Sequence, residues 1–155
     1  MAPPRGALML VVLLAVGTAA SLVAPAPTLL VTDTDSGAVL YSTTVSDGQT
    51  VKLEYTHSVE RSPVKEHYRI TDGTLRQTLI IFESYGWGLP TGADVERIGG
   101  QFHAPMDRSF DELMITPGPI ADQRLTVGET QLALYELAGR SSVRISIEYR
   151  RWHRV

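Results

Sequence analysis

Hydrophobic and polar residues alternate strictly in two runs near the middle of the chain, residues 51–57 and 64–70. A period of two is typical of a β-strand with one buried face. If residues 60–63 form a four-residue hairpin loop, counting outward from it pairs His57 with Glu66. An imidazole and a carboxylate are then expected to face each other on the side of the hairpin that otherwise carries the core.

The same count sets Tyr55 opposite Tyr68 and Leu53 opposite Ile70. A slip of one residue would turn every side chain to the other face, so the apolar face restricts the register.

A second hairpin is predicted by the Asp-Gly dipeptide at residues 72–73, which favours a two-residue type I′ turn between apolar runs. Counting from this turn sets Tyr68 against Gln77 and Glu66 against Leu79. Glu66 is therefore expected on a central strand.

Further turn signals follow along the chain. Gly128-Glu129 predicts a Gly-first two-residue loop between strands at 124–127 and 130–135, and a last alternating strand is expected at 143–149. The spacing of short strands and turns predicts an all-β fold, an antiparallel barrel or sandwich of about eight to ten strands built from consecutive hairpins.

Residues 1–24 have the composition of a targeting segment. Arg5 is the only charge, and an apolar run at residues 6–16 precedes several small residues. A cleaved signal peptide is favoured; an uncleaved signal anchor is the alternative, because the apolar stretch is roughly long enough to span a bilayer. Residues 25–155 are expected to form a single exported domain, periplasmic or at the cell surface, with membrane contact only through an uncleaved N-terminal segment.

Composition excludes several function classes. The chain has no Cys, which removes thiolate catalysis, Cys-type zinc sites and lipid attachment through an N-terminal Cys. The formal net charge is −3, and losing Arg5 would leave 13 basic against 17 acidic side chains. A mildly acidic domain lacks the basic footprint that nucleic-acid binding needs.

Polar residues around the first hairpin are the candidates for chemistry. A buried His opposite a Glu can form a charge-assisted hydrogen bond that orients a base or a ligand, or it can simply close the end of the core and fix the loop. We keep both interpretations. The candidate binding residues are His57, Ser58, Glu60, Pro63, Glu66, Glu83, Trp87 and Gly88.

Catalytic and cofactor motifs are absent from the sequence. There is no Gly-x-Ser-x-Gly elbow and no phosphate-binding glycine loop before a helix, so neither an enzyme nor a bound cofactor is expected. Asp33-Thr34-Asp35-Ser36-Gly37 starts like a calcium loop, but Thr44 stands where the bidentate Glu is required. That segment predicts a turn, and no metal site is assigned.

These residues also carry a resemblance. Tyr-Thr-His-Ser-Val-Glu at 55–60, Ser-Pro-Val at 62–64 with Glu66, and Glu-x-Tyr-Gly-x-Gly-Leu-Pro at 83–90 resemble a family of small exported bacterial and archaeal proteins catalogued as domain of unknown function 1850. The bulky Tyr85-Gly86-Trp87-Gly88 departs from the smaller residues expected around those glycines.

The resemblance implies an association with TRAP transporters of the TAXI type, whose permeases are encoded beside or fused to such proteins. We therefore expect a non-enzymatic extracytoplasmic accessory domain that contacts the permease or its substrate-binding protein through the loops at 58–63 and 85–90. The alternatives are a small-molecule or cation-binding domain built on His57, Glu60 and Glu66, and a hydrolase using His57 and Glu66.

Overall fold

Eleven strands and one short helix make up the part of the chain that the computed structural model describes, residues 26–150 without 87 and 93. In chain order they are β1 (Ala26–Asp33), β2 (Val39–Thr44), β3 (Thr50–Thr56), β4 (Pro63–Thr71), β5 (Thr74–Phe82), β6 (Glu96–Ile98), β7 (Gln101–Phe110), β8 (Glu112–Ile115), β9 (Arg124–Val127), β10 (Thr130–Ala133), α1 (Leu134–Ala138) and β11 (Val143–Arg150). The predicted signal segment lies outside the described residues. No helix in the described part is long and apolar enough to cross a membrane.

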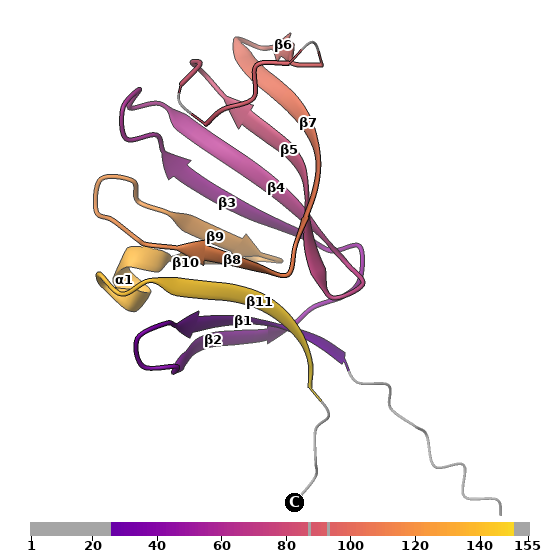
Figure 1. The fold of residues 1–155 in the computed structure, drawn as a ribbon, viewed down its shortest axis with the longest axis vertical. Coiled ribbons are helices and arrows are strands. Elements are labelled where there is room, and N and C mark those ends of the chain that lie inside the picture. The colour runs from indigo at the N-terminus through magenta and orange to yellow at the C-terminus, as the bar shows by residue number, and fades with distance from the viewer. Residues whose placement is uncertain (1–25, 87, 93, 151–155) are drawn as a thin grey trace, which may run out of the picture.

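The strands form two antiparallel sheets that pack as a sandwich (Figure 1). The small sheet has the order β2-β1-β11-β8, and the large sheet has the order β10-β9-β3-β4-β5-β7-β6. Of the two predicted architectures the sandwich is therefore confirmed, and the sheets do not close into a barrel. Only Asp111 separates β7 from β8, so the chain passes directly from the large sheet to the small one.

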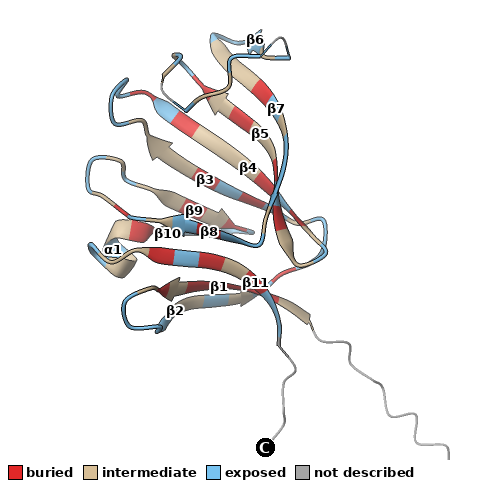
Figure 2. Cartoon of the chain, viewed as in Figure 1, coloured by how far each residue is buried: buried red, intermediate tan, exposed pale blue. Residues whose placement is uncertain are grey.

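The main core lies between the two sheets. Val31 and Ile145 of the small sheet and Val51, Ile70 and Leu125 of the large sheet belong to one cluster and are fully buried. Buried residues alternate with more exposed ones along β11 from Val143 to Glu148, as the period-two pattern predicts, but Tyr149, predicted on the buried face, is exposed (Figure 2). This cluster holds the two sheets together.

A second apolar cluster lies further along the inner face of the large sheet. It contains Val64, Ile80, Phe82 and Ala104, and it is covered by residues of the β5–β6 connection rather than by the small sheet. On β4, Val64 shares its face with the buried Ile70 of the first cluster, because residues an even number apart point the same way. The inner face of β4 therefore runs from one cluster to the other.

The β3–β4 hairpin has a longer loop than predicted. Thr56 pairs with Pro63, so residues 57–62 form a six-residue loop and His57 lies outside the ladder. Glu66 stands opposite Leu53 rather than His57, and the predicted pairings of this hairpin are wrong. The shift is an even number of residues, so every side chain keeps its predicted face.

The β4–β5 hairpin confirms the Asp-Gly turn. Asp72 and Gly73 have φ values of 49° and 77°, as a type I′ turn requires, and Tyr68 pairs with Gln77 as predicted. An irregularity beyond Gln77 then displaces the ladder by one residue, so that Ile80 rather than Leu79 lies opposite Glu66.

The β9–β10 hairpin also follows its predicted register, with Val127 paired to Thr130 and Leu125 to Leu132 across Gly128. The predicted strand at 130–135 is too long, because β10 ends at Ala133 and α1 begins. The helix, LYELA, is made of good helix formers except for its Tyr, and it ends at Ala138 before Gly139, whose φ is 62°. It buries Leu134 against the main core.

A cleft between the sheets, built around Glu66

The candidate residues fall into two places. His57, Ser58 and Glu60 lie in the β3–β4 loop and Pro63 begins β4, whereas Glu66 lies three residues further along the strand. Three strand residues span about 10 Å, so the structure does not bring Glu66 together with His57 and Glu60 as the predicted pairing required.

The remaining candidates lie in the β5–β6 connection. Glu83 is exposed and accepts a hydrogen bond of 3.3 Å from Gln101, and Gly88 is exposed with a φ of 85°. Trp87 lies outside the described residues.

His57 holds the β3–β4 loop in shape. Its backbone N–H donates to Ser62 O at 2.8 Å, and its backbone carbonyl accepts from Arg61 N at 2.9 Å. The ring nitrogen Nδ1 accepts a 3.3 Å hydrogen bond from the backbone N–H of Glu60. His57 therefore takes part in the hydrogen bonding that shapes this loop, and the predicted pair with Glu66 is not formed.

The β3–β4 and β5–β6 loops contact each other through a hydrogen bond and a close approach at Gly86. Ser62 Oγ and Ser84 Oγ are 3.0 Å apart and share a hydrogen bond. A Cβ atom added to Gly86 would lie 3.0 Å from both Glu60 Cγ and His57 Cε1, so only glycine allows this approach without a shift.

Tyr85 fixes the β5–β6 loop to the large sheet. Its ring centroid lies 5.3 Å from that of Phe82 and 4.4 Å from that of Phe102. This aromatic cluster covers the far end of the sheet, so the loop is anchored by packing.

Glu66 forms a separate polar cluster on the inner face of the large sheet. Tyr55 on β3 donates its hydroxyl proton to Glu66 Oε1 at 2.9 Å, and Tyr68 on β4 donates to Oε2. Gln77 Nε2 in turn donates to the Tyr68 hydroxyl at 3.4 Å. Each carboxylate oxygen therefore accepts one tyrosine hydroxyl.

Strand geometry explains this cluster. Leu53 pairs with Glu66, so Tyr55 and Tyr68, each two residues further along its own strand, point to the same face as the carboxylate. The two tyrosines are not among the predicted site residues. The alternation alone placed both of them on the face of Glu66, so the signal was present in the sequence.

The tyrosine hydroxyls are held in their protonated form. Burial, followed by the charge of Glu66 and the hydrogen bond to it, raises the pKa of both Tyr55 and Tyr68 above the usual value for a phenol. Both side chains therefore remain donors to the carboxylate at neutral pH.

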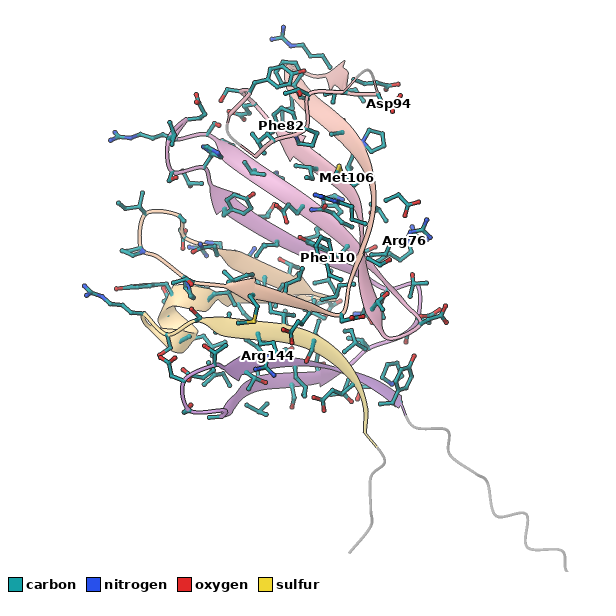
Figure 3. All side chains as sticks on the ribbon, in the orientation of Figure 1. Arg76, Phe82, Asp94, Met106, Phe110 and Arg144 are labelled. Atoms are coloured by element: carbon teal, nitrogen blue, oxygen red, sulfur yellow. The ribbon has the colours of Figure 1, made fainter. Side chains whose placement is uncertain are left out.

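The Glu66 cluster borders a cleft of about 430 Å³ between the sheets. One wall is the inner face of β3 and β4, and the other is β8, the edge strand of the small sheet. Phe110, labelled in Figure 3, lies where β7 leads into β8. The lining residues are Leu53, Tyr55, Glu66, Tyr68, Phe110, Glu112, Leu113, Met114, Ile115, Thr116 and Gln123.

The side chains that line the cleft carry negative charge and no positive charge. Glu66 and Glu112 are the acidic residues, and no Lys, Arg or His is among the lining residues. Glu112 alternates with the buried Leu113 along β8, so its side chain points to the outer face of the small sheet, and Glu66 is the acidic group on the inner face. Arg144 pairs with Glu112 at 3.3 Å, and both of these side chains are about half exposed. Glu66 forms no ion pair with any residue of the described part of the chain.

Metal ligands do not gather in the described part of the chain. No group of three or more His, Asp or Glu side chains there is placed to hold a metal ion. The Asp33 segment forms the predicted turn, with Asp33 Oδ1 accepting hydrogen bonds from the backbone N–H groups of Asp35 and Ser36 at 3.0 and 2.8 Å.

Comparison with protein families bears on the same region. A family model described as domain of unknown function (DUF1850) matches residues 51–134, more than half of the chain. The chain belongs to the DUF1850 family. No curated protein and no solved structure matches it.

In this DUF1850 domain, all the residues that line the cleft lie inside the matched segment. The segment contains most of β3, all of β4 to β10, and the first residue of α1. Both walls of the cleft therefore come from the family domain, whereas β1, β2 and β11 lie outside the matched range.

Proposed function

We propose that this domain is a non-enzymatic, extracytoplasmic binding module that holds a small organic ligand in the cleft between its sheets. The observation that carries the proposal is the Glu66 carboxylate, fixed by Tyr55 and Tyr68 at the wall of a cleft of about 430 Å³. Clefts that bind small molecules have volumes of about 300–1,000 Å³ and combine apolar walls with a few oriented polar groups. The cleft fits this description.

The hydrogen bonding leaves Glu66 able to bind a ligand. An ionised carboxylate offers about four acceptor positions, and the two tyrosines occupy one on each oxygen. The remaining positions are available to a ligand, and the tyrosines hold the carboxylate in one orientation. A preoriented group loses less conformational freedom when the ligand binds.

The same contacts favour binding over hydrolysis. The Tyr55 and Tyr68 hydroxyls donate to Glu66 and have raised pKa values, so neither is prepared as a nucleophile. His57 accepts a loop hydrogen bond and is not in the cleft lining. These features support a module that holds its ligand without transforming it.

Nuclear magnetic resonance with a chemically diverse fragment panel tests the proposal. Fragments that bind should shift the backbone amide signals of β3, β4 and β8 along the cleft, and leave those of β2 unchanged. A panel of cations, anions and neutral compounds at millimolar concentration that shifts no cleft signal would contradict a binding role for the cleft.

As a second role, we propose that the domain serves a TRAP-type transporter of the TAXI class as an accessory domain outside the cytoplasmic membrane. The resemblance suggests the transporter. The β3–β4 and β5–β6 loops, which are hydrogen-bonded to each other, are the surface that we propose contacts it. Val59 and Tyr85 in these loops are large apolar side chains that are 69% and 47% exposed. Exposed apolar residues on anchored loops are suited to a protein partner.

Crosslinking in cells that express the transporter tests the accessory role. The permease or its substrate-binding protein should be recovered with the wild-type domain, and recovery should fall with Val59→Ser, which removes apolar surface at an exposed position. Ile120→Ser is the matched control, because Ile120 is 75% exposed and lies outside both loops. Recovery of no transporter component with the wild-type domain would contradict the role.

A further inference from the structure

We infer that the cleft selects organic cations, primary amines or guanidinium compounds with a small apolar body, and that Glu66 is the group that binds the cationic end. This inference rests on the proposed binding function and adds the chemical class of the ligand. It follows from the charge, the donor and acceptor balance, and the apolar surface of the cleft.

The charge of the cleft favours a cation. Glu66 is the charged lining side chain on the inner face of the sheets, whereas Glu112 points to the outer face of the small sheet and pairs there with Arg144. Glu66 has tyrosine donors and no ionic partner among the described residues. An anionic ligand would meet the Glu66 carboxylate, whereas a cation would supply the ionic partner that Glu66 lacks.

The hydrogen-bonding groups point to a ligand that donates. The hydroxyl protons of Tyr55 and Tyr68 are already directed at Glu66, so they do not serve a ligand acceptor without leaving the carboxylate. The free acceptor positions of Glu66 suit N–H donors. Ammonium and guanidinium groups supply such donors together with positive charge, and they form the stronger charge-assisted bonds with carboxylates.

The remaining surface suits an apolar body attached to the cationic group. The ring centroids of Tyr68 and Phe110 are 6.2 Å apart in an edge-to-face arrangement, and both residues line the cleft. Leu53, Leu113 and Ile115 complete an apolar surface beside the carboxylate. Aromatic rings attract cations and also pack against hydrocarbon, so a short aliphatic or aromatic amine fits both features.

Three probes of nearly equal size separate charge from shape: benzylamine is a cation, benzyl alcohol is neutral, and benzoate is an anion. Their dissociation constants are measured by titration of the amide spectrum of the wild-type protein. Benzylamine is expected to bind at least about ten-fold more tightly than either of the others, because one charge-assisted hydrogen bond has this value.

Two isosteric variants locate the binding group. Glu66→Gln removes the charge in the cleft and is expected to weaken benzylamine binding about ten-fold or more. Glu54→Gln is the matched control, because it makes the same change of net charge at a residue paired with Lys65 and absent from the cleft lining. It is expected to change the affinity less than about two-fold, since a partly exposed charge outside the cleft is screened.

The source of the cation is tested with a fourth probe, Nα-acetyl-lysine amide. Tighter binding of benzylamine would assign the cleft to free organic amines, and tighter binding of the lysine derivative would assign it to a lysine side chain of a peptide. Either result supports recognition of a cation.

The outcomes separate this inference from the proposed function. Equal binding of benzylamine, benzyl alcohol and benzoate, or tightest binding of benzoate, would overturn the cation assignment. The proposal that the cleft binds a small molecule would then still stand. An equal effect of Glu66→Gln and Glu54→Gln would likewise overturn the role of Glu66. No shift of cleft signals with any of these four probes would overturn the cation assignment, and no shift with the whole fragment panel would overturn the binding function as well. The wild-type series does not depend on the folding of a variant.

Discussion

The hydroxyl of Tyr68 provides the sharpest test of the Glu66 cluster in terms of stability. Tyr68→Phe removes one oxygen and leaves the ring, so the edge-to-face contact with Phe110 is kept. The change deletes the hydrogen bond to Glu66 Oε2 and also the acceptor of Gln77 Nε2. The substitution therefore isolates polar interactions from packing.

The magnitude follows from these two contacts. A hydrogen bond to a charged group contributes about 1.5–3 kcal/mol. Glu66 is only half-buried, so water in the cleft can replace part of the lost hydrogen bond from Tyr68. Gln77 is 4% exposed and would keep a buried amide N–H without its partner, which costs about 1 kcal/mol for a bond as long as 3.4 Å. We expect Tyr68→Phe to lower the free energy of unfolding by about 2–4 kcal/mol.

Tyr55→Phe is the matched comparison. Tyr55 also donates to Glu66, but it is half-buried and its hydroxyl has no second partner in the described part of the chain. Its loss is expected to cost about 1–2 kcal/mol, less than the loss of the Tyr68 hydroxyl.

Urea unfolding followed by circular dichroism measures both values through linear extrapolation. A double-mutant cycle with Glu66→Gln should give a coupling energy of about 1–3 kcal/mol for Tyr68. A Tyr68→Phe protein within about 0.5 kcal/mol of wild type, the range of ordinary surface changes, would refute the reasoning. So would a larger loss for Tyr55→Phe.

Three further predictions follow from individual contacts. Because the pKa values of Tyr55 and Tyr68 are raised by folding, their contribution to stability is complete below about pH 10 and declines as the pH rises above it, where the unfolded tyrosines ionise. Urea midpoints between pH 8 and 11 should therefore fall less steeply in either Phe variant than in wild type; equal slopes would contradict this. Gly86→Ala should cost about 1–2 kcal/mol because its Cβ would press on His57 at 3.0 Å, whereas Gly92→Ala, with open space around it, should change stability by less than about 0.5 kcal/mol. Equal urea midpoints for the two alanine variants would count against the loop contact. Hydrogen bonds from Ser36 lower the pKa of Asp33, so Asp33→Ala should be less stable than wild type at neutral pH, and the difference should shrink as the pH falls below 3.8, the usual pKa of the group. A difference in urea midpoint that persists unchanged at pH 2–3 would contradict this.

The hairpins were predictable wherever the sequence contains the residues typical of a two-residue turn. Asp72-Gly73 and Gly128-Glu129 fixed both the turn and the pairing beside it, because a tight turn leaves one register. The β3–β4 loop has no such signal, and its six residues are held by backbone bonds of His57. Alternation restricted the face of each side chain and left the position along the strand open.

The candidate site was predictable in one part only. The alternating pattern correctly placed Glu66 on the core face, and the assumed loop length gave it the wrong partner. The cleft itself depends on β8, which lies more than 40 residues further along the chain and faces β4 across the cleft because the two sheets pack together. Local sequence patterns carry no information on such a contact. The turn into β8 at Asp111 gave no recognisable signal.

A crystal structure of the protein with benzylamine tests the central claim most directly. We expect the ring in the cleft beside Phe110 and the amine nitrogen about 2.7–3.0 Å from an oxygen of Glu66, with both tyrosine hydroxyls still bound to that carboxylate. A cleft that holds only water at saturating ligand, or an amine bound elsewhere while Glu66 keeps only its tyrosine partners, would contradict it.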